Sequence, residues 1–522
     1  MKEIKYELIK DYISEDERLC KKLYKYIEEN QITLLVAPQG IGKTVFVKSL
    51  MKRYTTLVAA PTISLAEQNE KDFRLEPSRG RSWNTFSWSQ ITNLNEPIRN
   101  TSTTFASASG LLLANDLDCF DLVVVDEIHK LVQYSTFSYS NVESIVETLN
   151  KAVNLNKKLL LITATPDLFY CLKGFNFKKQ IDLKIYIHKD KKYFEKCVAM
   201  YNLNQERTLL KQIRENHRQN KFQIVLYNNR KGICNIEKKL KTHGINALSC
   251  TSKDFSENSH IRNIIKDMKN GNYHNYDVLL TTSWIDVGLN FVGKNINFMY
   301  CVFDQNYENG DFTIIRQFMA RARNSNPILY IGVPQLTPNE EKLSSNYDLI
   351  KRDERLFTDL KKIASVILES YEKGLIRNDI LFKTFYGIYE KENSCYGYSD
   401  LTLRYQIHKL FEKAIVQEYN TRGIAYLLGV REEDIVSPGV INQQYYETIQ
   451  SLLDDWYNQN KLFQMSELTE KIKELSYGTI DSSRPTRYIQ RNYGYTTKRD
   501  SGNLKITNLD RLIFTKNGEF TI

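Results

Sequence analysis

The sequence predicts an α/β protein with two successive domains, each built on a parallel sheet, followed by helical segments. Two series of short apolar runs carry this prediction. The first comprises residues 33–37, 56–60, 122–125 and 159–163, and the second comprises residues 223–227, 277–282, 297–303 and 328–333. Uninterrupted apolar runs of this length are typical of parallel strands buried on both faces. Longer stretches with helical spacing separate the runs, as in alternating βα units.

The length and composition agree with this fold class. A chain of 522 residues corresponds to roughly three or four domains at about 150 residues each. The chain contains 22 Gly and 10 Pro, a low share of turn-forming residues that predicts many helices and few long loops. Its formal net charge of +10 is compatible with a polyanionic partner.

The sequence gives no sign of a membrane or secreted protein. No apolar run approaches the roughly 18 residues that a membrane-spanning helix needs, and the N-terminal residues lack an apolar signal segment. The 8 cysteines lie far apart without a Cys-x-x-Cys pair, which favours reduced thiols over a zinc site or a disulfide framework. We therefore expect a cytoplasmic protein without a membrane partner, located in the host cytosol if a phage encodes it.

A phosphate-binding loop is predicted at residues 37–44, Ala-Pro-Gln-Gly-Ile-Gly-Lys-Thr, between an apolar run and a helical stretch. Backbone N–H groups of such a loop, together with the positive end of the following helix, bind phosphate oxygens. Gly40 and Gly42 permit the close approach. The Lys43 ammonium would reach the β- and γ-phosphates, and the Thr44 hydroxyl would complete a Mg²⁺ site. We assign ATP binding to Gln39, Gly40, Ile41, Gly42, Lys43 and Thr44.

An acidic pair, Asp126 and Glu127, ends the apolar run 122–125 and is followed by Ile128 and His129. Asp126 would hold Mg²⁺ together with Thr44, and Glu127 would orient and deprotonate the water that attacks the γ-phosphate. In isolation, such a pair could equally be a helix N-cap, and His129 could be a solvated or capping histidine. The phosphate-binding loop upstream favours the catalytic interpretation.

With these two motifs, the chain resembles the superfamily 2 helicases. Asp126-Glu-Ile-His129 resembles their DExH box, and further segments resemble their other motifs in the same order. These segments are residues 61–68, 103–108, 163–166, 224–230, 281–290 and 317–323. The resemblance covers about residues 30–335 and implies two tandem RecA-like (P-loop) domains with ATP bound between them.

The resemblance also implies roles for individual residues. Contacts with a nucleic-acid strand would come from Thr62, Ser64, Thr104, Ser107 and Thr282. Coupling of hydrolysis to movement would involve His129, Thr163, Thr165 and Gly288. The last motif, residues 317–323, would supply Gln317, Arg321 and Arg323 to the transition state for phosphoryl transfer.

That last motif departs from the commoner Gln-x-x-Gly-Arg-x-x-Arg pattern. Ala320 replaces the Gly and the second arginine comes one residue early, so the sequence leaves open which of Arg321 and Arg323 is the arginine finger. The shortened form is similar to helicases of the herpesvirus origin-binding type and their phage or mobile-element relatives.

The C-terminal tail has a different pattern. Residues 464–475 read as an amphipathic helix, residues 482–492 as a second helix, and residues 493–505 as two strands around a Ser-Gly turn. This order resembles a winged helix-turn-helix domain. Residues 482–505 hold half of the net charge, with one Asp against the basic residues Arg484, Arg487, Arg491, Lys498, Arg499 and Lys505. The segment is either a DNA-binding surface or a solvated basic face that contacts protein.

We therefore expect a first motor domain at residues 1–185, a second at 186–340, a helical connector at 341–440 and a C-terminal winged-helix domain at 441–522. The implied activity is that of an ATP-dependent DNA helicase or translocase, acting in replication of a phage or mobile element. Single-stranded DNA would lie across the motor and duplex DNA at the tail. Replication proteins are possible partners. Two alternatives stay open: a sequence-specific origin-binding initiator with an accessory ATPase, and an RNA helicase.

Overall fold

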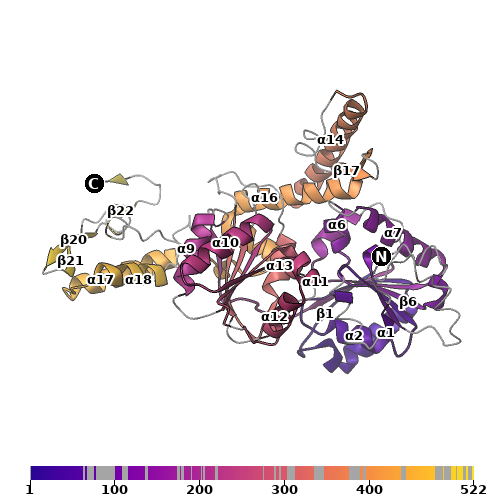
Figure 1. Ribbon diagram of the computed structural model, residues 1–522, viewed down its shortest axis with the longest axis horizontal. Coiled ribbons are helices and arrows are strands. Elements are labelled where there is room, and N and C mark those ends of the chain that lie inside the picture. Colours follow the sequence, from indigo (N-terminus) through magenta and orange to yellow (C-terminus); the bar gives the residue numbers. More distant parts are fainter. Residues whose placement is uncertain are drawn as a thin grey trace.

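The computed structural model contains two parallel α/β domains that lie next to each other along the long axis of the molecule (Figure 1). The residues it describes are 2–62, 65–66, 76–77, 100–107, 116–135, 139–172, 177, 181–189, 191–200, 203, 206–217, 222–273, 275–286, 290–292, 296–302, 312–333, 346–375, 388–391, 395–436, 443–475, 486, 489, 495–500, 503–509, 513–514 and 520–521. The two tandem α/β domains predicted from the sequence are confirmed.

Within the described residues, the first sheet has eight strands in the order β1-β8-β2-β7-β6-β3-β5-β4, and every pair is parallel. In chain order the strands are β1 (Lys2–Glu7), β2 (Ile32–Val36), β3 (Thr56–Ala60), β4 (Glu76–Pro77), β5 (Thr101–Thr104), β6 (Leu122–Val125), β7 (Lys158–Thr163) and β8 (Leu183–His188). The phosphate-binding loop follows β2 and the acidic pair follows β6. Because all strands run the same way, both segments lie at one edge of the sheet.

The second sheet has seven parallel strands among the described residues, in the order β11-β12-β10-β14-β16-β9-β19. They are β9 (Cys197–Met200), β10 (Phe222–Tyr227), β11 (Ala247–Cys250), β12 (Val278–Thr281), β14 (Ile296–Val302), β16 (Ile328–Gly332) and β19 (Ile435–Val436). A small separate sheet pairs β13 (Phe291–Val292) with β15 (Ala322–Arg323).

Apolar packing on both faces explains why these runs are strands. All residues of β2, β3 and β6 are buried. The neighbours Leu34 and Leu35 belong to separate apolar clusters, as expected for the two faces of one strand. Helices of the first domain cover these faces: α1 (Glu17–Glu29), α2 (Lys43–Leu50), α6 (Lys130–Tyr134) and α7 (Tyr139–Asn154). The Asp16 side chain caps α1 by accepting from the Leu19 N–H at 2.9 Å.

Five helices and a short 3₁₀ turn accompany the second sheet in the described part of the chain. They are α9 (Glu206–His217), α10 (Arg230–Thr242), α11 (Ser252–Glu257), α12 (Ser259–Lys269), α13 (Phe312–Met319) and the 3₁₀ turn η5 (Ser283–Asp286). Of these, α13 carries Gln317 and ends just before Arg321. Its position therefore decides where the last predicted motif lies.

Two long helices follow the second domain. The first, α14 (Asn346–Glu372), projects from the body of the molecule, and α16 (Asp400–Leu428) runs along both α/β domains (Figure 1). Between them, β17 (Ile388–Lys391) and β18 (Cys395–Tyr398) form an antiparallel pair.

The sheets extend beyond the boundaries expected from the sequence. Strand β8 ends at His188, past the expected boundary at 185, and pairs with both β1 and β2. Strand β19 and the β17–β18 pair lie within residues 341–440, which we expected to be a helical connector. A two-residue strand such as β19 has no periodicity to detect, and its pairing with β9 depends on tertiary contacts.

The tail contains α17 (Gln443–Asn458), α18 (Met465–Leu475) and an antiparallel pair, β20 (Tyr495–Asp500) with β21 (Asn503–Leu509). Two further strands, β22 (Ile513–Phe514) and β23 (Phe520–Thr521), pair with each other. The tail has its own apolar cluster, in which the Trp456 and Phe463 rings lie 4.6 Å apart. The expected helix at 464–475 and the two expected strands are present. The expected helix at 482–492 lies outside the described residues except for Thr486 and Ile489.

Within the described part of the chain, the structure contains no helix that is both long and apolar enough to cross a membrane.

Candidate functional site: a nucleotide cleft between the two domains

The phosphate-binding loop has the left-handed backbone turns that its glycines allow. Gly40 has φ +70° and Gly42 has φ +83°, a region where a residue with a Cβ is strained. A Cβ at Gly42 would come within 3.3 Å of the Tyr12 Cβ, which closes off that side of the loop. Helix α2 begins at Lys43, so its free N–H groups face the loop. This is the backbone arrangement of an anion-binding loop.

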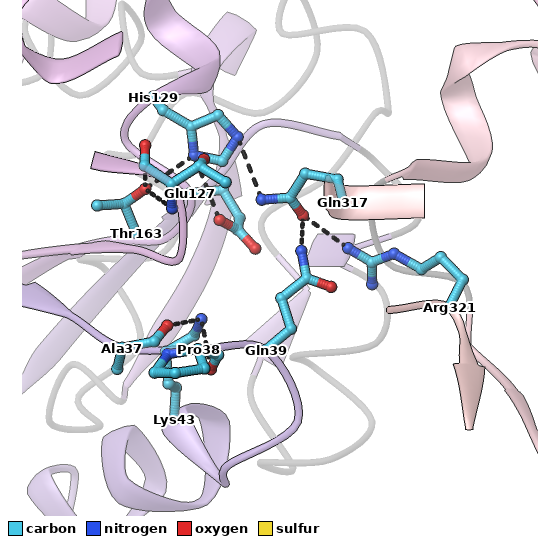
Figure 2. A network of polar contacts seen from close by, with 10 residues as sticks. Ala37, Pro38, Gln39, Lys43, Glu127, His129, Thr163, Gln317 and Arg321 are labelled. Atoms are coloured by element: carbon cyan, nitrogen blue, oxygen red, sulfur yellow. Dashed lines mark hydrogen bonds and ion pairs between the residues drawn. The ribbon is translucent and has the colours of Figure 1, made fainter. Parts of the chain in front are cut away.

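Lys43 turns its ammonium back over the loop (Figure 2). Its Nζ donates to the carbonyl oxygens of Ala37 at 2.8 Å and Pro38 at 3.3 Å. Burial lowers the pKa of Lys43, and the nearby carboxylates of Glu127 and Asp126 oppose that shift. Lys43 therefore lies between the loop and the acidic pair, where a phosphate group would favour its charged form.

The acidic pair is placed directly beyond β6. Burial, with the neighbouring Glu127 charge as the second cause, raises the pKa of Asp126 to about 7. Glu127 is 8% exposed and adopts φ 54°, a left-handed conformation that is rare for a residue other than glycine. Such conformations gather at functional sites because the surrounding fold must hold them in place. The Glu127 Oε2 lies 3.4 Å from the His129 Nδ1.

His129 is completely buried and joins the acidic pair to the end of β7. Its Nδ1 lies 3.0 Å from the Thr163 Oγ1, which also accepts from the Thr165 N–H at 3.0 Å and donates to the Thr165 carbonyl at 3.2 Å. We assign the ring proton of His129 to Nδ1, because the Thr163 hydroxyl can then donate to the Thr165 carbonyl and the Glu127 carboxylate lies on the same side of the ring. Burial, followed by the charge of Lys130, keeps the pKa of His129 well below its ordinary value, so the ring is neutral.

Gln317 enters this network from the second domain (Figure 2). Its Nε2 lies 3.5 Å from the His129 Nε2, the ring nitrogen left without a proton. Its Oε1 accepts from the Gln39 side chain of the phosphate loop and from Arg321 Nη2, the latter at 3.0 Å. One buried amide thus contacts the phosphate loop, the DExH-like segment and an arginine of its own domain.

The two arginines of the last motif differ in their surroundings. Arg321 is 6% exposed and also donates from Nη1 to the Asn290 Oδ1 at 3.3 Å. Arg323 is exposed, yet it lines the cleft as well. Beside them, Arg316 of α13 forms an ion pair with Asp167, which lies in the 3₁₀ segment η4 (Pro166–Leu172) of the first domain. The second domain therefore presents several cationic groups to the first.

Two adjoining cavities lie between the domains. The first, of about 410 Å³, is lined by most of the residues predicted for ATP and catalysis: Gln39, Gly40, Gly42, Lys43, Thr44, Asp126, Glu127, Arg321 and Arg323. The second, of about 430 Å³, shares Tyr12, Gln39, Gly40 and Arg323 with the first. Ile41 is buried, so it contributes backbone to the loop.

Several residues of this cleft were not found from the sequence. Tyr12 lines both cavities, and Lys191 and Tyr193 line the second. The Tyr193 hydroxyl donates to the Gln39 carbonyl at 3.0 Å, and burial raises the pKa of Tyr193 to about 12. These residues carry no motif signal because Tyr12 lies before the phosphate loop, and Lys191 and Tyr193 lie between β8 and β9, outside every predicted motif. Asn290 stood inside a recognised motif but was not assigned a role.

The residues expected to touch nucleic acid occupy carboxyl ends of strands. Thr62 follows β3, Thr104 ends the neighbouring strand β5, and Thr282 follows β12 of the second sheet. The Thr62 hydroxyl accepts from the Leu65 N–H at 3.2 Å, and the hydroxyls of Thr104 and Ser107 lie 3.0 Å apart. Ser64, Gly288, Arg484, Arg487 and Arg491 lie outside the described residues. Strand β20 contains Lys498 and Arg499, but their side chains are not among those described.

Comparison with known families and proteins finds similarity to parts of this chain. Residues 7–168 match the family model described as "Type III restriction enzyme, res subunit". An uncharacterized protein of Methanocaldococcus jannaschii is 24% identical over 322 residues, which amount to 59% of this chain. The chain spans 23% of the length of that curated relative.

Among solved structures, Dbp5 of S. cerevisiae bound to RNA and ADP BeF3 is similar with a TM-score of 0.44 and 12% identity. The match covers 62% of this chain and 90% of that one. The Hef helicase domain of Pyrococcus furiosus is similar with a TM-score of 0.37 and 15% identity, covering 65% of this chain and 98% of that one.

The two parallel α/β domains, with the phosphate-loop cleft between them, form a tandem RecA-like fold. The phosphate loop and the acidic pair both fall inside the matched residues 7–168. Gln317 and Arg321 fall outside them, and only the spatial arrangement joins them to the matched domain.

Proposed function

We propose that this protein is an ATP-dependent DNA helicase or translocase that hydrolyses ATP between its two α/β domains. The observation that carries the proposal is the position of Gln317, which contacts Gln39 of the phosphate loop and lies 3.5 Å from the His129 Nε2. An ATPase that worked within one domain would have no need of this contact. A motor does need it, because nucleotide binding must change how the two domains sit together.

The chain's own residues account for binding and hydrolysis of ATP. The loop N–H groups and Lys43 would hold the β- and γ-phosphates, and Glu127 would orient the attacking water and accept its proton. Thr44 and Asp126 line a common cavity, and their hydroxyl and carboxylate oxygens are of the kind that fits Mg²⁺. When bound, Mg²⁺ neutralises charge on the β- and γ-phosphate oxygens.

We assign different roles to the two arginines. Arg321 is engaged by Gln317 and Asn290, so it would set the closed geometry of the cleft. Arg323 lines both cavities and is exposed, so its guanidinium would meet the charge that spreads over the transferring phosphoryl group. We therefore propose Arg323 as the arginine finger.

Two observations favour DNA over RNA. The family model that matches residues 7–168 is described as a restriction-enzyme subunit, and restriction enzymes act on DNA. The tail pairs helices with the antiparallel strands β20 and β21 around a separate apolar cluster, an arrangement compatible with a winged helix-turn-helix. With Lys498 and Arg499 in β20, the tail would bind duplex DNA through its phosphates. A role in phage or mobile-element replication, with replication proteins as partners, belongs to this proposal.

ATPase measurements with different nucleic acids test the proposal. We expect single-stranded DNA to raise kcat at least tenfold, duplex DNA to do so less, and RNA to have little effect. The Lys43→Ala variant is the control, since it removes hydrolysis without removing the tail. Stimulation by RNA alone would replace the DNA assignment with that of an RNA helicase.

The same proteins distinguish a motor from an origin-binding initiator. An initiator in which duplex recognition is primary would protect one sequence from nuclease digestion even as the Lys43→Ala variant. A helicase or translocase would instead bind without sequence preference, and its affinity would fall steeply with salt concentration.

A further inference from the structure

Helix α16 packs on both α/β domains. Near its N-terminal end, Leu401 and Tyr405 belong to the apolar core of the first domain, and the Thr402 Oγ1 donates to the Ser135 carbonyl at 2.9 Å. Toward its C-terminal end, the buried residues belong to the core of the second domain: Ile415, Val416, Ile424, Ala425, Leu427 and Leu428. A single 29-residue helix therefore runs along both α/β domains (Figure 1).

Helix α16 touches elements of both domains that carry or adjoin residues of the site. On the first domain it contacts α6, which begins immediately after His129, and the segment η4, which contains Asp167. On the second domain it contacts α13, which contains Gln317. The helix is thus in contact with the supports of both partners of the His129–Gln317 pair.

One carboxylate makes the link to α13. The Glu412 Oε2 accepts from the backbone N–H of Phe312, the first residue of α13, at 3.0 Å. The Glu412 Oε1 lies 3.1 Å from the His408 Nε2, and Glu412 is 3% exposed. The first N–H groups of a helix have no partner within the helix, and a carboxylate there is favoured by the helix dipole. Glu412 therefore fixes where α13 begins, five residues before Gln317.

We propose that α16 is a bridging helix that holds Gln317 and Arg321 in register with the first domain, and that Glu412 is its positioning residue. The expected effect of Glu412 on kcat rests on the proposed ATPase activity, whereas the connection of the two domains by α16 rests on geometry alone. When the cleft opens, α16 must leave one domain. Among its described side chains, it buries two apolar ones in the core of the first domain and six in the core of the second, so it separates from α6 and stays with α13.

The projecting helix α14 moves with α16 in this proposal. The Arg404 guanidinium lies 3.8 Å from the ring centroid of Phe357 in α14, and Phe357 shares an apolar cluster with Leu403 and Ile407 of α16. Opening and closing of the cleft would therefore swing α14 relative to the first domain.

Kinetics of three variants test the role of Glu412. Glu412→Leu removes the acceptor for the Phe312 N–H, and we expect kcat per active site to fall about tenfold with KM for ATP within about twofold. Glu412→Gln keeps an oxygen acceptor and should retain kcat within about threefold. Glu369→Leu, at an exposed position of α14, should match the wild type.

A double-mutant comparison separates positioning from simple stability. If Glu412 acts through Gln317, then Glu412→Leu should lower kcat less than twofold in a Gln317→Ala background. Equal tenfold losses in both backgrounds, or a wild-type kcat in folded Glu412→Leu, would overturn the inference. The proposed function would be refuted instead if the wild type hydrolysed no ATP, or if its hydrolysis persisted in Lys43→Ala.

Hydrogen exchange tests the bridge without using ATPase activity. Thr402→Val removes the bond to the Ser135 carbonyl in the first domain at nearly constant volume. We expect amide exchange to become faster both in α6 and in α13, and Glu412→Leu to have the same effect on α13. Faster exchange confined to α6 in Thr402→Val would show that α16 does not connect the domains.

Discussion

The side-chain amide of Gln317 lies 3.5 Å from the Nε2 of His129, across the boundary between the two α/β domains. The residues stand 188 positions apart in the chain. Because the Nδ1 of His129 donates to Thr163, its Nε2 can only accept, and Gln317 can satisfy it from the other domain. The contact makes the acidic segment of one domain depend on the position of the other.

We predict that this contact is required for turnover. Gln317→Ala should lower kcat about a hundredfold, since it leaves His129, Gln39 and Arg321 without a shared partner. Combining it with His129→Ala should add little to the loss, because both changes break the same network. Steady-state ATPase assays of the two single variants and the double variant measure this. Fully multiplicative losses would show that the residues act independently.

We predict that the two arginines have separable effects. Arg323→Ala should lower kcat about a thousandfold with nearly unchanged nucleotide affinity, because its charge acts on the transition state. Arg321→Ala should have a smaller effect that is not additive with Gln317→Ala, because Arg321 donates to Gln317. Affinity for a fluorescent ATP analogue and kcat are the readouts. A larger loss in Arg321→Ala would reverse the assignment of the finger.

Lys43→Ala and Glu127→Gln should both abolish ATP hydrolysis, but they should differ in their effect on ATP binding. Lys43→Ala removes the ammonium that would meet the phosphates, so it should abolish turnover and weaken ATP binding. Glu127→Gln keeps the volume but removes the base, so it should bind ATP and fail to release phosphate. Equilibrium binding and rapid-quench measurement of phosphate distinguish the two. Undiminished hydrolysis in either variant would refute the assigned site.

Stability should depend on pH through His129. Burial holds its pKa well below the ordinary value of 6.5 in the folded state, whereas the unfolded chain takes up a proton near that pH. Neutral His129 therefore contributes fully to the free energy of unfolding above about pH 6.5, and this contribution is lost as the pH falls below that value. Denaturant unfolding at pH 7.5 and 5.5 should show a larger loss for the wild type than for His129→Asn. Identical losses would mean that His129 titrates normally.

Removal of the tail should separate DNA binding from basal hydrolysis. Its apolar cluster is distinct from the cores of the two motor domains, so a chain ending at residue 440 should keep basal ATPase and lose about tenfold or more in duplex affinity. A chain ending at residue 430 is the matched control. It also loses β19 from the second sheet and should be less stable. Unchanged DNA affinity after removal of residues 441–522 would refute the role of the tail.

The sequence by itself determined the two series of buried strands, and it predicted the chemistry of the phosphate loop and of the acidic pair. Both signals are local: apolar runs mark strands such as β2 and β6, and Lys43, Asp126 and Glu127 adjoin strands that the pattern reveals. The second-domain residues Gln317, Arg321 and Arg323 were also found, because their motif is short and contiguous.

The tertiary structure decided which of these residues meet. Three contacts depend on how separate segments pack. Gln317 contacts Gln39, Tyr193 donates to the Gln39 carbonyl, and Glu412 accepts from the first N–H of α13. No periodicity or motif encodes such contacts, because each joins side chains or backbone groups more than 90 residues apart. For the same reason, the sequence predicted only a helical connector over residues 341–440, and only packing revealed that one helix within it, α16, spans both domains.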